Sequence, residues 1–468
     1  MPPNILVLIM DSVRAANCSL NGYHRDTTPF LSHTSGVNFL QARAPSNLSL
    51  PSHVSMFTGV EATDHSLHGR DRALVHGDTV WKWLQQEGYE TGVFSRNAFI
   101  TLPEYGLTAG FDTIKSDFST EEPPFPSGLN PTELSGMNPQ SYLSVCLDNP
   151  NPVPSLLNGV AMRYRGSPFL PSRFQYRPKP VGKAVAQSCL DWIDETTDPW
   201  GACLNFTDAH QPYLPTPTHN LWGPVPNSVY RGKTDIRWEL IAGNRSWEQT
   251  EILEDLYDGA IHQTDAAIQI LFKSLEATDE LSDTLVVVTS DHGDCFGEEC
   301  GLRDVRHLTH TGGVPEELLH VPLLIKNPNE TGTETVDGIT SLTRMPAVIR
   351  KAVAGDARPS DAMIHDKPVI ASADHDLRYA PIEVTEAHEY VENLSGRATA
   401  VYDKAAGRKY IKWGDDTAVV DVSTGEIIAE QIPEEMSQHM QASPSDIGGE
   451  KRAIGQEARE RLADLGYK

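Results

Sequence analysis

The sequence of 468 residues is poor in lysine. Only 14 of its 38 basic residues are lysines, whereas Asp and Glu together number 64. The resulting formal net charge of −26 would repel nucleic-acid phosphates and anionic membrane surfaces, which excludes functions that depend on a basic patch. A composition rich in acids and poor in lysine is typical of salt-loving microbes, so we expect an acidic, halophilic protein that has no nucleic-acid partner.

Long hydrophobic runs are also missing. The longest apolar stretch near the N-terminus is Ile5–Met10, whereas a bilayer-spanning helix needs roughly 20 residues. This stretch follows no basic region, precedes no cleavage site and runs directly into Asp11, so it predicts a first strand and not a signal peptide. We therefore expect a cytoplasmic protein without a membrane span. With 39% hydrophobic residues, the chain can bury a globular core.

The cysteines are few and form no Cys-x-x-Cys pair, which argues against both a disulfide framework and a zinc ribbon. We expect them to be mostly reduced and structural. They are Cys18, Cys146, Cys189, Cys203, Cys295 and Cys300.

Short apolar runs rich in Ile, Val and Leu alternate with amphipathic segments of helical length. This pattern predicts an α/β fold, in which helices cover both faces of a mixed, mostly parallel central sheet. The clearest predicted strands are Asn4–Met10, Thr91–Ser95, Ala202–Thr207, Thr284–Thr289 and Val321–Ile325. The clearest predicted helices are Thr79–Glu87, Gly182–Glu195 and Trp247–Leu275.

The composition also predicts a domain organisation. Residues 1–365 are expected to form the main α/β domain, and residues 116–180, rich in Pro, Gly, Ser and Asn, an irregular insertion that shapes substrate access. Residues 366–468 are expected to form a small antiparallel subdomain that ends in a charged helix at about 450–465.

Acidic residues follow two of the predicted strands. Asp11 ends the first strand, and Asp291, His292, Gly293 and Asp294 end the fourth. Ligands of open α/β sheets bind at the carboxyl ends of the strands, and adjacent Asp and His side chains suit a divalent cation such as Mn or Zn. The alternative is an Asp that caps the next helix beside a surface histidine.

Ser49 lies two residues before Pro51, a spacing that predicts the start of a helix. Its hydroxyl would lie at the positive end of the helix dipole, where a nucleophile meets an anionic substrate favourably. The alternative is a serine that only caps the helix.

Five segments carry motifs that occur in the same order in a known family. They are PNILVLIMDSVRA, SLPSHVSMFTG, NFTDAHQPYLP, TLVVVTSDHGD and HTGGVPEELLHVPLLIKNP. Together they resemble the sulfatases of the alkaline phosphatase superfamily. The family's nucleophile motif is matched by Ser49, Pro51, Ser52, Thr58 and Gly59. His53 replaces the arginine of that motif. The resemblance implies a mixed sheet between helices and a small C-terminal antiparallel sheet, as the periodicity also predicts.

The resemblance further implies that one divalent metal is bound by Asp11, Asp291 and His292 together with Ser49. The family's second acidic residue is replaced by Ser12, a poor ligand for Ca, which favours Mn or Zn and leaves Ca as a further option. His210 matches the family histidine that protonates or orients the leaving oxygen. His310 lies in the region where the family has a residue that contacts the substrate oxyanion.

Other positions have implied but less specific roles. A family lysine that binds sulfate is absent, and Arg96 or Asn97 could replace it, with His53 as a third substrate-binding candidate. A second metal would need ligands such as Asp208, His210 and His310, but one metal is favoured. His307 and His320 are interpreted as structural or surface residues.

The sequence therefore predicts a metal-dependent sulfuric ester hydrolase acting on a small-molecule or glycan substrate, with Ser49 or a formylglycine derived from it as nucleophile. A phosphodiesterase, phosphonate monoester hydrolase or phosphoryl transferase that uses unmodified Ser49 is the alternative within the superfamily. A non-catalytic, glycan-binding pseudoenzyme is the alternative of another class.

Overall fold

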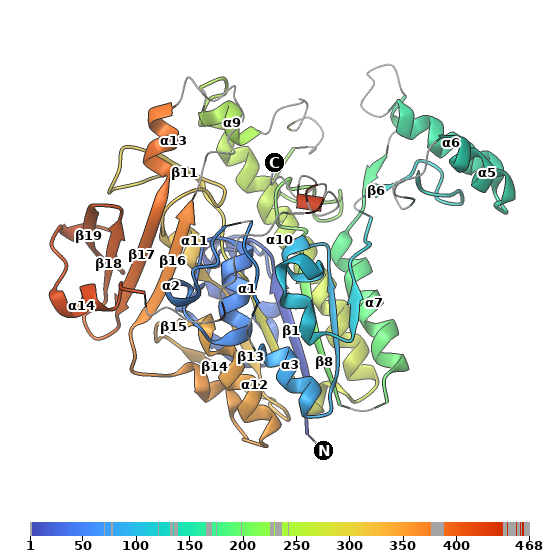
Figure 1. The fold of residues 1–468 in the computed structure, drawn as a ribbon. Helices are drawn as coiled ribbons and strands as arrows, with labels where there is room; N and C mark the ends of the chain where they lie inside the picture. The colour runs from blue at the N-terminus through green and yellow to red at the C-terminus, as the bar shows by residue number, and fades with distance from the viewer. Residues whose placement is uncertain are drawn as a thin grey trace.

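A computed structural model gives the structure of most of the chain, with an eight-stranded sheet at its centre (Figure 1). Every structural statement below concerns the residues that it describes. These are 2–69, 71–75, 78–119, 121–131, 134, 139–164, 171–174, 176–197, 199–224, 229, 236–241, 243–375, 388–442, 447, 455, 459, 461 and 462.

The central sheet is mixed and mostly parallel, as expected. Its strand order is β14-β2-β13-β9-β1-β8-β4-β5. The bounds are β1 Asn4–Met10, β2 Gly36–Phe39, β4 Glu90–Ser95, β5 Thr113–Lys115, β8 Trp200–Phe206, β9 Thr284–Thr289, β13 Leu323–Lys326 and β14 Thr333–Val336. In the middle of the sheet, β1 runs parallel to both β8 and β9, so the carboxyl ends of these three strands meet at one edge.

Helices cover both faces of the sheet, and the residues of β1 alternate between the two resulting cores. Ile5, Val7 and Ile9 pack with side chains of α1, α3 and α12, whereas the residues between them face α7 and α10. Figure 1 shows the two helical layers. The helices are α1 Ser49–Thr58, α2 Ala62–His65, α3 Val80–Gln86, α4 Ala98–Thr101, α5 Pro139–Asp148, α6 Pro152–Arg163, α7 Val181–Glu195, α9 Ile236–Ile241, α10 Gln249–Ala277, α11 Glu316–Leu319, α12 Met345–Val353, α13 His388–Leu394 and α14 Glu434–Gln438.

The strand predicted at Val321–Ile325 is in fact two strands. β12 (His320–Val321) pairs with β3 (Ala42–Arg43), which also pairs with β15 (Thr340–Ser341), whereas β13 belongs to the central sheet. Pro322 separates them, since proline has no N–H to give to a ladder.

The segment expected to be irregular contains two helices, α5 and α6, which project from the body of the molecule at the upper right of Figure 1. Two of the prolines in this segment lie at helix starts, where a missing N–H costs nothing: α5 begins at Pro139 and α6 at Pro152. The short strands β6 (Glu121–Glu122) and β7 (Arg177–Pro178) pair at the base of this projection.

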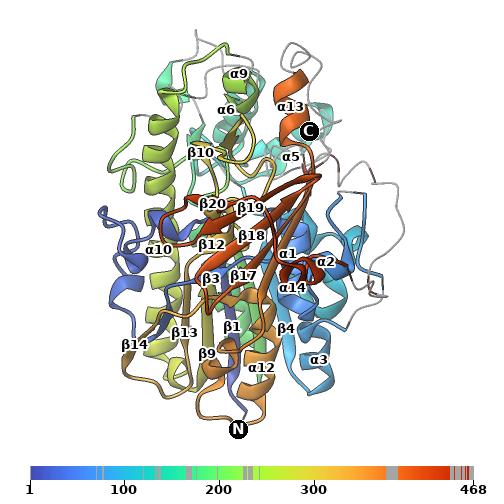
Figure 2. The same cartoon turned by 90° about the vertical axis from the view of Figure 1, so that its left-hand side faces the viewer.

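The C-terminal part of the chain forms the expected antiparallel sheet, which has five strands (Figure 2). They are β16 Val369–His375, β17 Gly396–Asp403, β18 Arg408–Trp413, β19 Asp416–Asp421 and β20 Ile427–Ala429. A buried ion cluster ties this sheet to the main domain, because Glu316 of α11 contacts Lys409 of β18 at 2.6 Å and Arg43 of β3 at 2.9 Å.

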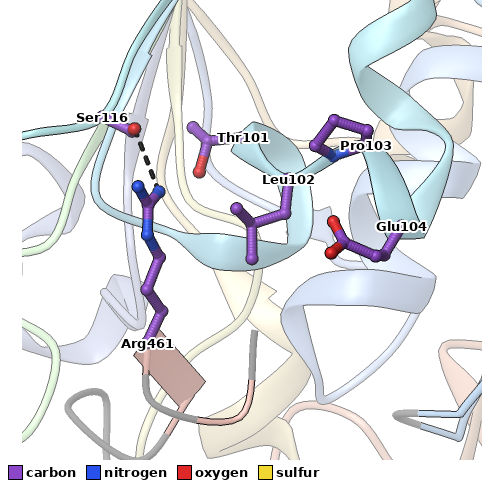
Figure 3. Close-up of a pocket in the computed structure, with 6 residues that line it drawn as sticks. All are labelled: Thr101, Leu102, Pro103, Glu104, Ser116 and Arg461. Carbon is purple, nitrogen blue, oxygen red and sulfur yellow. Dashed lines mark hydrogen bonds between the residues drawn. The ribbon is translucent and has the colours of Figure 1, made fainter. Parts of the chain in front are cut away.

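The last described residues return to the main domain. Leu462 is buried in the hydrophobic core that also contains side chains of α1 and α3. Arg461 donates to Ser116 Oγ at 3.0 Å (Figure 3). A cavity of about 600 Å³ lies here, lined by Thr101, Leu102, Pro103, Glu104, Ser116 and Arg461. The charged helix predicted at about 450–465 falls largely outside the described residues.

None of the helices in the described part of the chain combines the length and the apolar character needed to cross a bilayer. The six cysteines are all unpaired, and all except Cys300 are buried.

Candidate active site

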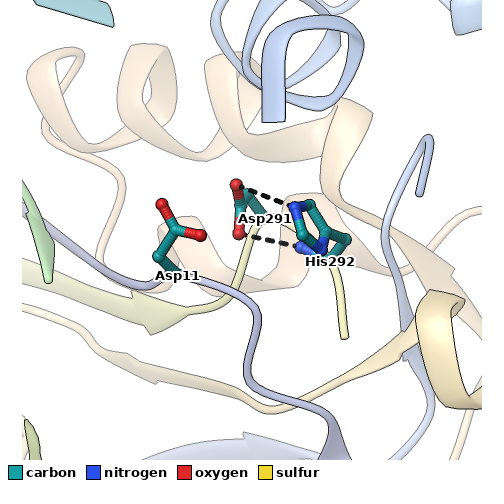
Figure 4. Close-up of side chains that lie close together, drawn as sticks. All are labelled: Asp11, Asp291 and His292. Carbon is teal, nitrogen blue, oxygen red and sulfur yellow. Dashed lines mark hydrogen bonds and ion pairs between the residues drawn. The ribbon is translucent and has the colours of Figure 1, made fainter. Parts of the chain in front are cut away.

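The side chains predicted at the strand ends do meet at one edge of the central sheet. Asp11 follows β1, and Asp291 and His292 follow β9, the parallel neighbour of β1. One ligand atom from each of the three lies within 4.8 Å of the other two, and all three residues are buried. Figure 4 shows the two carboxylates and the imidazole facing one another.

Asp291 presents one oxygen to the site and has the other fixed. Oδ1 accepts hydrogen bonds from the backbone N–H groups of Ser12 at 3.1 Å and His292 at 3.0 Å. Oδ2 is buried without a hydrogen-bond partner among the described residues. Burial acts to raise the pKa of this carboxyl, but the neighbouring His292 and His53 outweigh it, so the pKa lies below its ordinary value. The surroundings of Asp291 therefore favour its ionised form.

His292 is held in one tautomer. Its Nδ1 lies 2.8 Å from the carbonyl oxygen of Gly293, which can only accept, so Nδ1 carries the proton and Nε2 faces the site. Nε2 is 3.3 Å from Ser49 Oγ and 3.6 Å from Asp291 Oδ2. Gly293 is required at this turn because a Cβ there would approach the carbonyl oxygen of Glu317 to 1.9 Å.

Ser49 is the first residue of α1, as its spacing from Pro51 predicted. The N-cap is Leu48, so the alternative that Ser49 only caps the helix is wrong. Its hydroxyl faces His292 instead. Ser52, one turn along the helix, donates from Oγ to the carbonyl oxygen of Asp291 at 2.5 Å. This bond fixes the start of α1 against the end of β9, which places Ser49 beside the strand-end cluster.

Asp11 is oriented by two polar neighbours. Ser12 Oγ donates to Oδ1 at 3.0 Å, and Asn97 Nδ2 donates to Oδ2 at 2.9 Å. Asn97 also caps α4, since its Oδ1 accepts from the N–H of Phe99 at 3.0 Å. The structure therefore places the Asn97 side chain on Asp11, whereas the sequence suggested a contact with substrate. Arg96 is half-buried beside it.

The three clustered residues fit a divalent cation. They offer two carboxylates and an imidazole, a mixed oxygen and nitrogen set that suits Mn or Zn. The orphaned Oδ2 of Asp291 and the fixed Nε2 of His292 both face the cluster. A histidine that ligates a metal commonly donates its other N–H to a carbonyl, as His292 does here.

Two further histidines lie next to this cluster. The ring of His310 is 5.1 Å from that of His292, and the ring of His210 is 5.6 Å from that of His310, measured between centroids. His210 Nδ1 lies 2.8 Å from the carbonyl oxygen of Gln211. The structure thus brings together the histidines that the resemblance assigned to the leaving group and to the substrate oxyanion.

His53, which replaces the motif arginine, lies within the site. Its Nδ1 donates to the carbonyl oxygen of Ser49 at 2.7 Å and is 3.7 Å from Asp291 Oδ2. The imidazole is buried, and its Nε2 has no hydrogen-bond partner in the described part of the chain. It is therefore a neighbour of the nucleophile candidate.

The remaining candidates have contacts elsewhere. Both carboxylate oxygens of Asp208 are engaged, with the N–H of Gly182 at 2.7 Å and with Gln263 Nε2 at 2.6 Å, so this residue joins α7 to α10 and not to a second metal. His307 stacks on Trp413 with ring centroids 6.1 Å apart. His320 Nε2 lies 2.7 Å from the carbonyl oxygen of Leu40. Both histidines are structural, as expected.

Sequence reasoning missed the hydrogen bonds that orient the site. Ser12, Ser52 and Asn97 act on the clustered residues through hydrogen bonds, and Tyr213 donates to Asp294 at 2.5 Å. Asp294 was noticed only as part of the strand-end run. Tyr213 follows His210 by three residues, but this spacing alone does not indicate a contact with Asp294.

The chain is similar to several known proteins. The family profile described as Sulfatase matches residues 3–352. An arylsulfatase of Clostridium perfringens is 22% identical over 349 residues, 70% of this chain and 69% of that protein. Among solved structures, the phosphonate monoester hydrolase of Agrobacterium radiobacter has a TM-score of 0.62 at 15% identity, with 99% of this chain and 95% of that chain covered.

A further solved structure is that of a protein in complex with its substrate D-glucosamine-2-N,6-O-disulfate. It has a TM-score of 0.55 at 16% identity, and the match covers 90% of this chain and 92% of that chain. At these identities, the likeness to the two solved structures shows a shared fold.

Proposed function

This chain belongs to the sulfatase family, and from that premise we propose that it is a metal-dependent hydrolase of sulfate esters in which Ser49, or a formylglycine derived from it, is the nucleophile. The observation that carries the proposal is the convergence of Ser49 Oγ with Asp11, Asp291 and His292 in one buried cluster. A hydroxyl, two acidic groups and an imidazole from three distant parts of the sequence have little structural reason to meet unless they hold a common ligand.

Each residue then has a chemical task. Asp11, Asp291 and His292 would hold one divalent cation, Mn or Zn before Ca, and that cation would neutralise charge on the sulfuryl group and lower the pKa of the nucleophile. The oxygen at position 49 gives its proton to solvent and forms a bond to sulfur, and the bond from sulfur to the leaving oxygen breaks. Sulfate then leaves position 49, by elimination from the aldehyde hydrate when that residue is a formylglycine. His210 supplies the proton that the leaving oxygen gains, and His310 contacts a non-bridging oxygen of the substrate.

The substrate class follows from the same reasoning. The arylsulfatase similarity supports a sulfate monoester, and the resemblance in fold to a protein that takes a disulfated glucosamine makes a sulfated sugar a candidate. Arg96 and His53 stay candidates for contacts with the substrate anion, because one is half-buried beside Asn97 and the other lies next to Ser49.

A second candidate function is the hydrolysis of a phosphate diester or phosphonate monoester by unmodified Ser49. It is favoured by His53. In the family, the enzymes that convert the nucleophile to formylglycine recognise an arginine at this position of the motif, and here that arginine is replaced by a histidine. A sulfate ester on a plain serine is difficult to release without the elimination that a formylglycine hydrate permits, whereas a phosphoryl group can be passed to water. The intact ligand cluster argues against a non-catalytic binding protein.

Turnover of p-nitrophenyl sulfate, p-nitrophenyl phenylphosphonate and bis-p-nitrophenyl phosphate, each with Mn, Zn and Ca, tests the proposal. We expect metal-dependent turnover of the sulfate, abolished in Ser49→Ala and retained in Ser55→Ala. The control removes a buried hydroxyl of the same helix whose Oγ contacts His65 at 3.0 Å. Turnover of the phosphorus esters alone would select the second function, and no turnover of any ester would contradict both.

The mass of the peptide that carries Ser49, isolated from the native host, separates the two chemistries independently. A peptide lighter by two hydrogen atoms indicates formylglycine and supports sulfate ester hydrolysis. An unmodified peptide supports phosphoryl transfer.

A further inference from the structure

Asp294 and His310 are neighbours because a hairpin brings them together. β10 (Phe296–Glu299) and β11 (Arg306–Leu308) pair in antiparallel fashion. The ladder is extended by two backbone hydrogen bonds between Cys295 and Thr309, of 3.1 and 2.7 Å. Asp294 precedes Cys295, and His310 follows Thr309, so the two residues lie next to each other beyond the end of the ladder. His310 Nδ1 lies 3.9 Å from Asp294 Oδ1.

The carboxylate of Asp294 is itself fixed from behind. Its Oδ2 accepts from Tyr213 Oη at 2.5 Å, and its Oδ1 accepts from the N–H of Cys295 at 3.2 Å. Asp294 is fully buried, and Tyr213 is 1% exposed. The ring of Tyr213 packs against Tyr257 and Phe296, with centroids 5.3 and 5.8 Å apart, so its hydroxyl has little freedom to turn away.

The backbone before His310 is also constrained. Thr309 has a φ of 52°, a left-handed conformation that a β-branched residue rarely adopts. Such strain persists where the surroundings impose it, and it is concentrated at functional sites. Here the two hydrogen bonds to Cys295 impose it, and they direct His310 toward His292 and His210.

Asp294 is not part of the cation cluster. Among the described residues, the group that could hold a metal consists of Asp11, Asp291 and His292, although Asp294 follows His292 by only two positions. A buried carboxylate that faces an imidazole nitrogen, and is held by a tyrosine, instead resembles the third member of a catalytic triad in its physical role: it sets the orientation of the imidazole.

We propose that Tyr213 and Asp294 are positioning residues for His310, which they hold with Nδ1 toward the carboxylate and Nε2 toward the substrate. The inference rests on the proposed function, since it requires that His310 contact the ester. The Tyr213 hydroxyl restricts the rotation of the Asp294 carboxylate, and that carboxylate restricts the orientation of the His310 imidazole. Loss of the tyrosine hydroxyl frees the carboxylate to turn, and the imidazole then leaves the orientation in which its contact is made.

A double-mutant cycle on the metal-loaded enzyme tests the inference. We expect Tyr213→Phe to lower kcat/KM about tenfold, the value of one hydrogen bond to a charged group. In the His310→Ala background the same substitution should change kcat/KM by less than about twofold, because the positioned group is gone. Asp294→Asn, which conserves volume, should also lower kcat/KM in the wild-type background and change it by less than about twofold in the His310→Ala background. Tyr89→Phe is the control, since that buried tyrosine donates to the carbonyl oxygen of Pro3 at 2.9 Å, at the far end of β1.

The outcomes are distinct. If Tyr213→Phe lowers kcat/KM equally with and without His310, the tyrosine acts through general stability and the inference is overturned. It is also overturned if His310→Ala turns over esters as fast as the wild-type protein. If the wild-type protein turns over no sulfate or phosphorus ester, the proposed function fails, which is a different result from additive losses in an active enzyme.

Discussion

The contact between Asn97 and Asp11 gives a quantitative prediction about metal affinity. Asn97 Nδ2 donates to Asp11 Oδ2 at 2.9 Å inside the protein, where Asn97 is 2% exposed. A hydrogen bond to a charged group contributes about 1.5–3 kcal/mol, and about 1.4 kcal/mol corresponds to a factor of ten. Asn97→Ala should therefore weaken Mn or Zn binding by about tenfold to a hundredfold, the usual effect of removing a partner that orients a ligand.

Isothermal titration of the metal-free protein with Mn or Zn measures this directly. Asn97→Ala also removes the cap of α4, which costs about 1 kcal/mol of folding stability. Asn97→Ser is the matched control, because serine can cap the helix but is too short to reach Asp11. We expect both variants to bind metal weakly and only the alanine variant to lose stability. Unchanged metal affinity together with a raised KM would refute the reasoning and return Asn97 to a contact with substrate.

Three further predictions concern the nucleophile, the metal and acid stability. Ser49→Ala should lower kcat by about a thousandfold or more in a steady-state assay while leaving the fold intact by circular dichroism; near-normal turnover would exclude Ser49 as nucleophile. Chelation should abolish turnover and lower the melting temperature, and Mn or Zn at about 100 times its dissociation constant should restore about 2.7 kcal/mol of stability; turnover that survives exhaustive chelation would contradict the metal requirement. Burial lowers the pKa of His307 to about 4, so the unfolded chain binds a proton between pH 6.5 and 4 that the folded one does not, and stability falls as the pH is lowered through this range. His307→Gln should remove about 3 kcal/mol of the difference in unfolding free energy between pH 7 and pH 4, measured by urea titration. The same difference in the wild-type protein and the variant would show that His307 is not held neutral.

The buried strands could be predicted from the sequence with the greatest precision. β1 and β9 match their predicted bounds, because unbroken runs of Ile, Val and Leu between polar residues leave little choice of strand ends. Two errors in the secondary structure came from proline. Pro322 divides one predicted strand between two sheets, and Pro139 and Pro152 start helices in a segment expected to be irregular.

The part of the site that follows from the sheet topology could be predicted from the sequence. Asp11 and Asp291 meet because they end neighbouring parallel strands, and strand ends are recognisable in a sequence. The contacts of Asn97 and Tyr213 depend on which loops cross at the sheet edge, and no spacing in the sequence encodes that. A cytoplasmic location and a halophilic source rest on composition and stay predictions.

Diffraction from crystals of the Mn- or Zn-loaded protein, recorded at the absorption edge of the metal, tests the central claim most directly. We expect one strong anomalous peak among Asp11, Asp291 Oδ2, His292 Nε2 and Ser49 Oγ. A peak at another place on the chain, or none at this cluster in an enzyme that turns over its ester, would contradict it.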